Sequence, residues 1–259
     1  MVFPIGDDNT GRTTTPVVNY LLIAANVLVF VLLQGLGSDD NRFTYAWATV
    51  PQEIVTGRDV VTPDRDVRVE PTEQRLRVPG LQPTPGSVYL TLLVSMFMHG
   101  GLMHLFGNML FLWIFGDNLE DRLGRARYLV FYLLCGVLAS LAHVFSTAAF
   151  SQGGSGMLVP SLGASGAISG VLGGYVLLFP RNRVHVLLFR VFTTVPAYVA
   201  LGLWFLFQFV SGLGLLGGGA REGGVAYAAH VGGFVAGLAL VKLFAAGRPA
   251  PAPAPRRGY

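Results

Sequence analysis

Two polar side chains within the long apolar stretches of this sequence have the residue types that covalent catalysis needs. Ser165 lies in the segment GASG at 163–166, and His230 lies in the segment AHVGG at 229–233. A serine hydroxyl becomes a nucleophile when a nearby histidine accepts its proton. The apolar stretches contain no Asp or Glu that could orient this histidine. We therefore expect a serine–histidine dyad.

Two more polar residues could donate hydrogen bonds to the oxygen of a tetrahedral intermediate. His104 and Asn108 are four residues apart, so a helix would place them on one face. Backbone N–H groups at the start of a helix near Ser165 would be further donors. His99 lies about 140° around the helix from His104 and is expected to face elsewhere. This offset argues against a metal or haem site formed by His99, His104 and His230, and no metal or cofactor is expected.

Each of these residues also has a purely structural interpretation. A serine at a helix start is most often a cap, a histidine within a membrane often packs or lines a pore, and Asn108 could bond across helices. The catalytic interpretation depends on their combination. By helical rise, Ser165 and His230 would both lie within about 10 Å of the outer membrane surface.

The elements that would position these residues are apolar stretches of membrane-spanning length. The chain of 259 residues is 52% hydrophobic and only 12% charged, whereas soluble domains carry about 25% charged residues. About 20 apolar residues cross a bilayer as a helix. We therefore predict an all-α, polytopic membrane protein with six spans, at 17–36, 88–115, 128–147, 161–180, 186–211 and 223–245.

The arginines predict the orientation of these spans, because cytoplasmic loops are enriched in basic residues. The short loop 116–127 contains Arg122, Arg125 and Arg127, whereas the loop 148–160 contains no charge. Both termini are therefore expected in the cytoplasm. The domain plan is a cytoplasmic tail at 1–16, a membrane domain at 17–245 and a disordered Pro/Ala-rich tail at 246–259. Within the membrane domain, residues 37–87 form a long external loop, with some strand character expected around 65–77.

Glycines repeat at four-residue intervals in two of the predicted spans. They are Gly166, Gly170 and Gly174 in one span, and Gly233 and Gly237 in another. Small residues at this spacing line one helix face and let helix backbones approach closely. We expect the two glycine faces to pack together and to bring Ser165 to His230.

Four motifs in this order resemble those of the rhomboid intramembrane serine proteases. They are HGGLMHLFGN at 99–108, GDNLEDRLG at 116–124, GASG at 163–166 and AHVGG at 229–233. The resemblance covers about residues 88–245. It implies a six-helix rhomboid-like bundle without a metal or cofactor.

The resemblance also assigns roles to residues. It implies that Ser165 is the nucleophile, that His230 is the general base, and that His104 and Asn108 help form the oxyanion hole. Gly163 would shape the turn before the serine, and Glu120 and Arg122 would tie down a cytoplasmic loop. The substrates would be transmembrane segments of other membrane proteins, cut near the external face through an acyl-enzyme.

The sequence departs from the best-studied bacterial rhomboids in two places. Those members have a tyrosine four residues after the nucleophile, stacked on the histidine, where this chain has Ser169. The loop 37–87 is also longer and more hydrophilic than theirs.

The sequence leaves two other functions open. One is a catalytically silent relative that binds membrane clients, and the other is a transporter or channel, although the spans carry no acid for ion coupling. The expected partners are membrane protein substrates and the lipid bilayer. Nucleic acid is not expected, because the net charge of +4 includes no basic cluster. The predominance of arginine over lysine suggests a bacterial cytoplasmic membrane.

Overall fold

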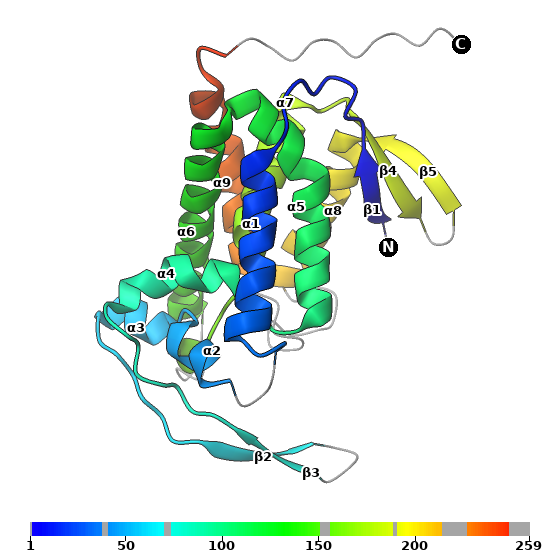
Figure 1. The fold of residues 1–259 in the computed structure, drawn as a ribbon. Coiled ribbons are helices and arrows are strands. Elements are labelled where there is room, and N and C mark those ends of the chain that lie inside the picture. Colours follow the sequence, from blue (N-terminus) through cyan, green and yellow to red (C-terminus); the bar gives the residue numbers. More distant parts are fainter. Residues whose placement is uncertain are drawn as a thin grey trace, which may run out of the picture.

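The computed structural model describes residues 2–37, 41–69, 74–150, 156–188, 191–213 and 227–248, and most of these are helical. Figure 1 shows the long helices side by side as a bundle. The main helices are α1 (Val17–Leu28), α5 (Leu102–Leu123), α6 (Arg125–Phe150), α7 (Ser165–Leu178), α8 (Ala197–Gly212) and α9 (Tyr227–Ala245). A π-helical turn, η1 (Val29–Leu33), continues α1. The shorter helices are α2 (Arg42–Trp47), α3 (Pro51–Thr56), η2 (Val88–Leu90), α4 (Thr91–Val94) and η3 (Ser95–Phe97).

Two helices in the described part of the chain, α6 and α9, are long and apolar enough to cross a membrane. A third candidate span is the broken pair 88–97 and 102–123, which bends by 79°. The stretches 17–33, 165–178 and 197–212 are apolar but shorter. All six predicted spans therefore contain apolar helix, but the count of six crossings is not confirmed. Residues 223–226 of the last predicted span lie outside the described residues, as do 151–155, 214–222 and 249–259.

The prediction of an all-α fold is confirmed only in part, because the described part of the chain is mostly helical but also forms strands. A three-stranded sheet has the order β1-β4-β5, with β1 at Val2–Asp7, β4 at Arg183–Leu188 and β5 at Val191–Pro196. It includes part of the predicted tail 1–16 and the beginning of the predicted span 186–211. The reason lies in the two-residue period of β4, in which buried Val184 and Val186 alternate with less buried neighbours.

The predicted strand character of the long loop is confirmed. Strands β2 (Arg65–Val69) and β3 (Gln74–Val78) pair as an antiparallel hairpin. The hairpin projects from the end of the bundle where α2 and α3 lie (Figure 1).

The predicted loop 116–127 is helical, because α5 continues to Leu123 and α6 begins at Arg125. Three polar residues of this segment are buried against partners near the N-terminus, namely Asp117, Asn118 and Glu120. Asp117 forms an ion pair with Arg12, and the carboxylate of Glu120 accepts hydrogen bonds from the backbone N–H groups of Val18 and Asn19 at 3.1 and 2.7 Å. Glu120 therefore satisfies unpaired N–H groups at the start of α1. Gly124 makes the sharp turn between the helices with a φ of +79°.

At the same end of the bundle, the start of α6 and the end of α5 contact the end of α9. Arg127, at the start of α6, donates hydrogen bonds to the carbonyl oxygens of Phe244 and Ala246, at the end of α9. Arg122 reaches the carbonyl oxygen of Ala245 at 3.5 Å. Because α7 and α9 both run towards this end, Ser165 at the start of α7 and His230 near the start of α9 lie at the opposite end.

The predicted glycine contact between α7 and α9 is confirmed. A Cβ atom added at Gly233 would overlap the carbonyl oxygen of Gly166, and one added at Gly237 would overlap that of Gly170. Only hydrogen atoms at these positions let the backbones approach so closely. Gly174 is part of the same packing and would meet Val241 of α9 at 3.1 Å.

Candidate functional site

Ser165 is the first residue of α7. The segment before it is held by a hydrogen bond to the short helix η3. The N–H group of Gly163 donates a hydrogen bond to the carbonyl oxygen of Ser95 at 2.9 Å. Gly163 has a φ of +132°, a conformation that glycine adopts readily and other residues rarely. This turn places Ser165 where the N–H groups of the first helical turn have no partner within the helix.

His230 lies in the first turn of α9, and both nitrogens of its ring have a partner. Its Nε2 atom lies 2.8 Å from Oγ of Ser165, and its Nδ1 atom lies 2.8 Å from Oε1 of Gln208 on α8. The ring of Trp204, one turn before Gln208, lies 6.1 Å from the imidazole between centroids. The structure thus brings the predicted serine and histidine into hydrogen-bonding contact.

His104 and Asn108 lie on α5, and the ring of His104 approaches the turn before the nucleophile. A Cβ atom at Gly163 would be 3.0 Å from Cε1 of His104 and 3.7 Å from Oγ of Ser165, so the histidine ring and the hydroxyl approach the same small residue. Asn108 is 8% exposed, and its amide donates to the carbonyl oxygen of His104 at 3.1 Å. As a donor to an oxyanion, this amide would have to turn away from that carbonyl.

The expectation that His99 faces away from His104 was wrong. His99 lies in the break between η3 and α5, not in a continuous helix, and its ring meets that of His104 at 5.1 Å between centroids. Its backbone N–H and carbonyl groups are held by the side chain of Gln34, at 2.8 and 3.1 Å. Among the described residues, no group of three or more His, Cys, Asp or Glu side chains could hold a metal ion.

Ser169, at the position where some rhomboids have tyrosine, forms a local bond within α7. It is 1% exposed, and its hydroxyl donates to the carbonyl oxygen of Ser165 at 2.6 Å. The ring of His230 has its contact at Nδ1 with Gln208 instead. Gln208 was not among the predicted site residues, although its sequence context held a signal, because a lone amide within an apolar span is a functional candidate by default.

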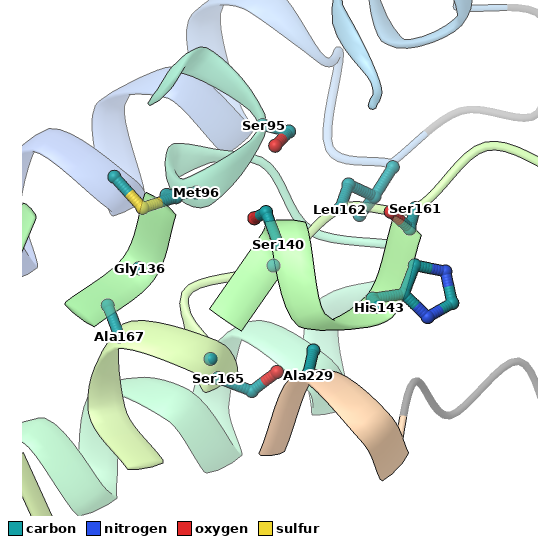
Figure 2. Close-up of a pocket in the computed structure, with 12 residues that line it drawn as sticks. Ser95, Met96, Gly136, Ser140, His143, Ser161, Leu162, Ser165, Ala167 and Ala229 are labelled. Atoms are coloured by element: carbon teal, nitrogen blue, oxygen red, sulfur yellow. The ribbon is translucent and has the colours of Figure 1, made fainter. Parts of the chain in front are cut away.

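A hollow opens beside Ser165, and none of its lining residues belongs to α8. Figure 2 shows Ser140 and His143 on α6, between Ser95 on one side and Ser165 and Ala229 on the other, and all of these residues line the hollow together with Ser161 and Leu162. Gly136, Gly163, Gly166 and Ala167 complete much of its wall. The space next to the nucleophile is therefore narrow, and its walls carry small or polar groups.

Comparison with known proteins gives a family match and several relatives. Residues 86–247 match the Rhomboid domain. The chain is 34% identical over 149 residues to "Rhomboid protein 1, mitochondrial" of Saccharomyces cerevisiae, which covers 58% of this chain and 40% of that protein. It is 34% identical over 127 residues to "Presenilin-associated rhomboid-like protein, mitochondrial" of Homo sapiens, which covers 45% of this chain and 32% of the relative. It is 29% identical over 227 residues to "Rhomboid protease GluP" of Bacillus subtilis, which covers 87% of this chain and 35% of the relative.

In each of these matches the chain spans less than half the length of the relative. Two of the three are mitochondrial proteins by name, so the comparisons do not support the predicted bacterial cytoplasmic membrane.

Proposed function

The chain belongs to the rhomboid family of integral membrane proteins, and we propose that it is an intramembrane serine endopeptidase that cleaves transmembrane segments of other membrane proteins. One observation carries this proposal, the 2.8 Å contact between Oγ of Ser165 and Nε2 of His230. A donor–acceptor distance in this range is what a general base needs to take the proton of its nucleophile.

In the proposed reaction, Ser165 attacks the scissile carbonyl carbon as its proton passes to Nε2 of His230. The oxygen of the tetrahedral intermediate is stabilised by N–H groups at the start of α7, together with His104 and Asn108. His230 then donates the proton to the leaving amine, which gives an acyl-enzyme. A water molecule, deprotonated by the same histidine, hydrolyses the ester and restores the serine.

The hollow next to Ser165 suggests which side chain precedes the cleaved bond. The small residues Gly136, Ala167 and Ala229 leave the hollow open. The larger side chains of Met96 and His143 limit its size, so we expect it to take a small side chain. A transmembrane segment must also unwind before its backbone can reach the serine. Substrates with small and helix-breaking residues near the external face therefore fit the site best.

The test is cleavage of a tagged single-span protein by the purified chain in liposomes. Ser165→Ala and His230→Ala should each abolish the product, whereas the matched controls Ser146→Ala on α6 and His185→Ala on β4 should retain it. A fluorophosphonate probe should label the wild type but not Ser165→Ala. Binding of the tagged protein without cleavage or labelling would instead indicate a catalytically silent client-binding relative.

A further inference from the structure

We propose that Gln208 is the positioning residue of this site, holding the imidazole of His230 in the tautomer that can accept a proton from Ser165. The inference rests on the proposed function, since it assigns a third member to the same site. Gln208 belongs to none of the four rhomboid-like motifs. It lies on α8, between the motif at 163–166 and the motif at 229–233.

The ring of His230 is held from two sides by two other helices. Its backbone belongs to α9, its Nε2 atom contacts Ser165 on α7, and its Nδ1 atom contacts Gln208 on α8, both at 2.8 Å. An imidazole with hydrogen bonds at both nitrogens cannot rotate without breaking one of them. Gln208 therefore restricts the ring to the plane in which Nε2 faces the hydroxyl.

The tautomer of His230 depends on whether the atom that faces Nδ1 is a hydrogen-bond donor or an acceptor. A carbonyl oxygen can only accept, so Oε1 of Gln208 requires a hydrogen on Nδ1 and leaves the lone pair on Nε2. That lone pair faces Oγ of Ser165 and can take its proton. If an N–H donor faced Nδ1 instead, the hydrogen would move to Nε2 and block the transfer.

An amide also suits the surroundings better than a carboxylate does. Gln208 is 8% exposed, in a helix that carries no charged residue from Ala197 to Gly212. An ionised side chain within a membrane segment is costly. The amide carbonyl provides an acceptor for the imidazolium without a permanent charge.

In the part of the chain that the structure describes, the residue of α7 four positions after Ser165 does not contact the ring of His230. The hydroxyl of Ser169 donates to the carbonyl oxygen of Ser165. The rings of Trp204 and Tyr227 lie 6.1 and 6.5 Å from the imidazole between centroids and are tilted by 37° and 85°, so neither stacks flat against it. The two hydrogen bonds are thus the directional contacts of the ring.

The test compares Gln208→Leu and Gln208→Glu with the α8 control Phe207→Leu, whose side chain is 48% exposed. We expect Gln208→Leu to lower kcat about 10- to 100-fold, the range typical of lost outer-shell partners, with KM changed less than twofold. Gln208→Glu should keep more activity than Gln208→Leu, and its activity should fall at a higher pH on the acid side, because a carboxylate stabilises the imidazolium. Phe207→Leu should match the wild type.

A second measurement does not depend on activity. In protein labelled with ¹⁵N-histidine, the His230 signals, identified by their loss in His230→Ala, should show the hydrogen on Nδ1 in the wild type and a mixture of tautomers in Gln208→Leu. Unchanged kcat and tautomer in Gln208→Leu would overturn the inference. So would equal losses in Gln208→Leu and Gln208→Glu that follow thermal stability without a change in the pH profile. An inactive wild type with the Nδ1–H tautomer would contradict the proposed function but not the role of Gln208.

Discussion

Thr49, in the long first loop, forms a two-way backbone bridge with Ser161, four residues before the proposed nucleophile. The N–H group of Thr49 donates to the carbonyl oxygen of Ser161 at 2.9 Å, and the N–H group of Ser161 donates back at 2.8 Å. The hydroxyl of Thr49 contacts the carbonyl oxygen of Thr91 at 3.0 Å and Oγ of Ser95 at 2.9 Å. Because Ser95 in turn accepts from Gly163, the loop 37–87 helps to fix the approach to Ser165.

Replacing Thr49 by valine should loosen this support without changing side-chain volume greatly. Thr49 is 1% exposed, so the loss of its hydroxyl leaves the carbonyl oxygen of Thr91 and the hydroxyl of Ser95 with one partner fewer. We expect Thr49→Val to lower the free energy of unfolding by about 1–3 kcal/mol and to reduce cleavage. Thermal unfolding in detergent and cleavage of the single-span substrate measure the two effects. The control is Thr56→Val, whose hydroxyl makes an exposed bond to the carbonyl oxygen of Gln52. Equal behaviour of the two variants would refute the role of Thr49.

The close approach of α7 and α9 predicts a strong effect from one added methyl group. A Cβ atom at Gly233 overlaps the carbonyl oxygen of Gly166, so Gly233→Ala should force the helices apart, at a cost of about 1–3 kcal/mol or more. The separation would also lengthen the contact between Ser165 and His230 and reduce cleavage. In Gly202→Ala on α8, the added Cβ would meet nothing within 4 Å, and this control should behave like the wild type. A normal melting temperature and turnover in Gly233→Ala would show that the interface tolerates the methyl group.

The contact between Ser165 and His230 could be predicted although the two residues are far apart in the sequence, because the patterns that indicate it are each local to one helix. Glycines four residues apart indicate a close helix interface, and polar residues at similar depth indicate a shared site. The position of His104 beside the nucleophile turn follows from the same reasoning. These features depend on spacing along single helices, which the sequence displays directly.

Other features depend on contacts between distant segments and could not be read in this way. The helix through Asp117 and Glu120 looked like a loop, because the partners that bury these acids, Arg12 and the start of α1, are about 100 residues away. His99 was assigned to a helix face although the chain is broken there. Gln208 could have been suspected from its apolar surroundings, but its pairing with His230 depends on how α8 packs against α9.

The amide of Asn108 provides a test of the proposed oxyanion hole. We expect Asn108→Ala to lower kcat by about 10²–10³-fold, the range for one lost oxyanion donor, with little change in the melting temperature. The comparison is Ser146→Ala on α6, which removes a hydroxyl that donates to the carbonyl oxygen of His143 in its own helix. A loss below threefold in Asn108→Ala would assign the oxyanion to other donors.

Asp7, at the end of the bundle opposite the site, should make the stability of the chain depend on pH. Burial raises the pKa of Asp7 from 3.8 to about 7, although Tyr175 and Asn118 donate hydrogen bonds to its Oδ2 atom at 2.5 and 2.7 Å. Between pH 4 and 7 the folded chain therefore holds a proton that the unfolded chain has lost. Stability from this group is greatest below pH 4, falls as the pH rises to about 7, and is constant above that.

Asp7→Asn keeps an oxygen that can accept from Tyr175 and removes the titration. Its melting temperature relative to that of the wild type should therefore rise between pH 4 and 7, with the full difference present at pH 8. The exposed control Asp66→Asn, on the projecting hairpin, should run parallel to the wild type across this range. Melting curves in detergent at half-unit pH steps make the comparison. If Asp7→Asn also ran parallel to the wild type, Asp7 would have to be ionised in the folded chain throughout, and its bond to Tyr175 would then be a bond to a carboxylate.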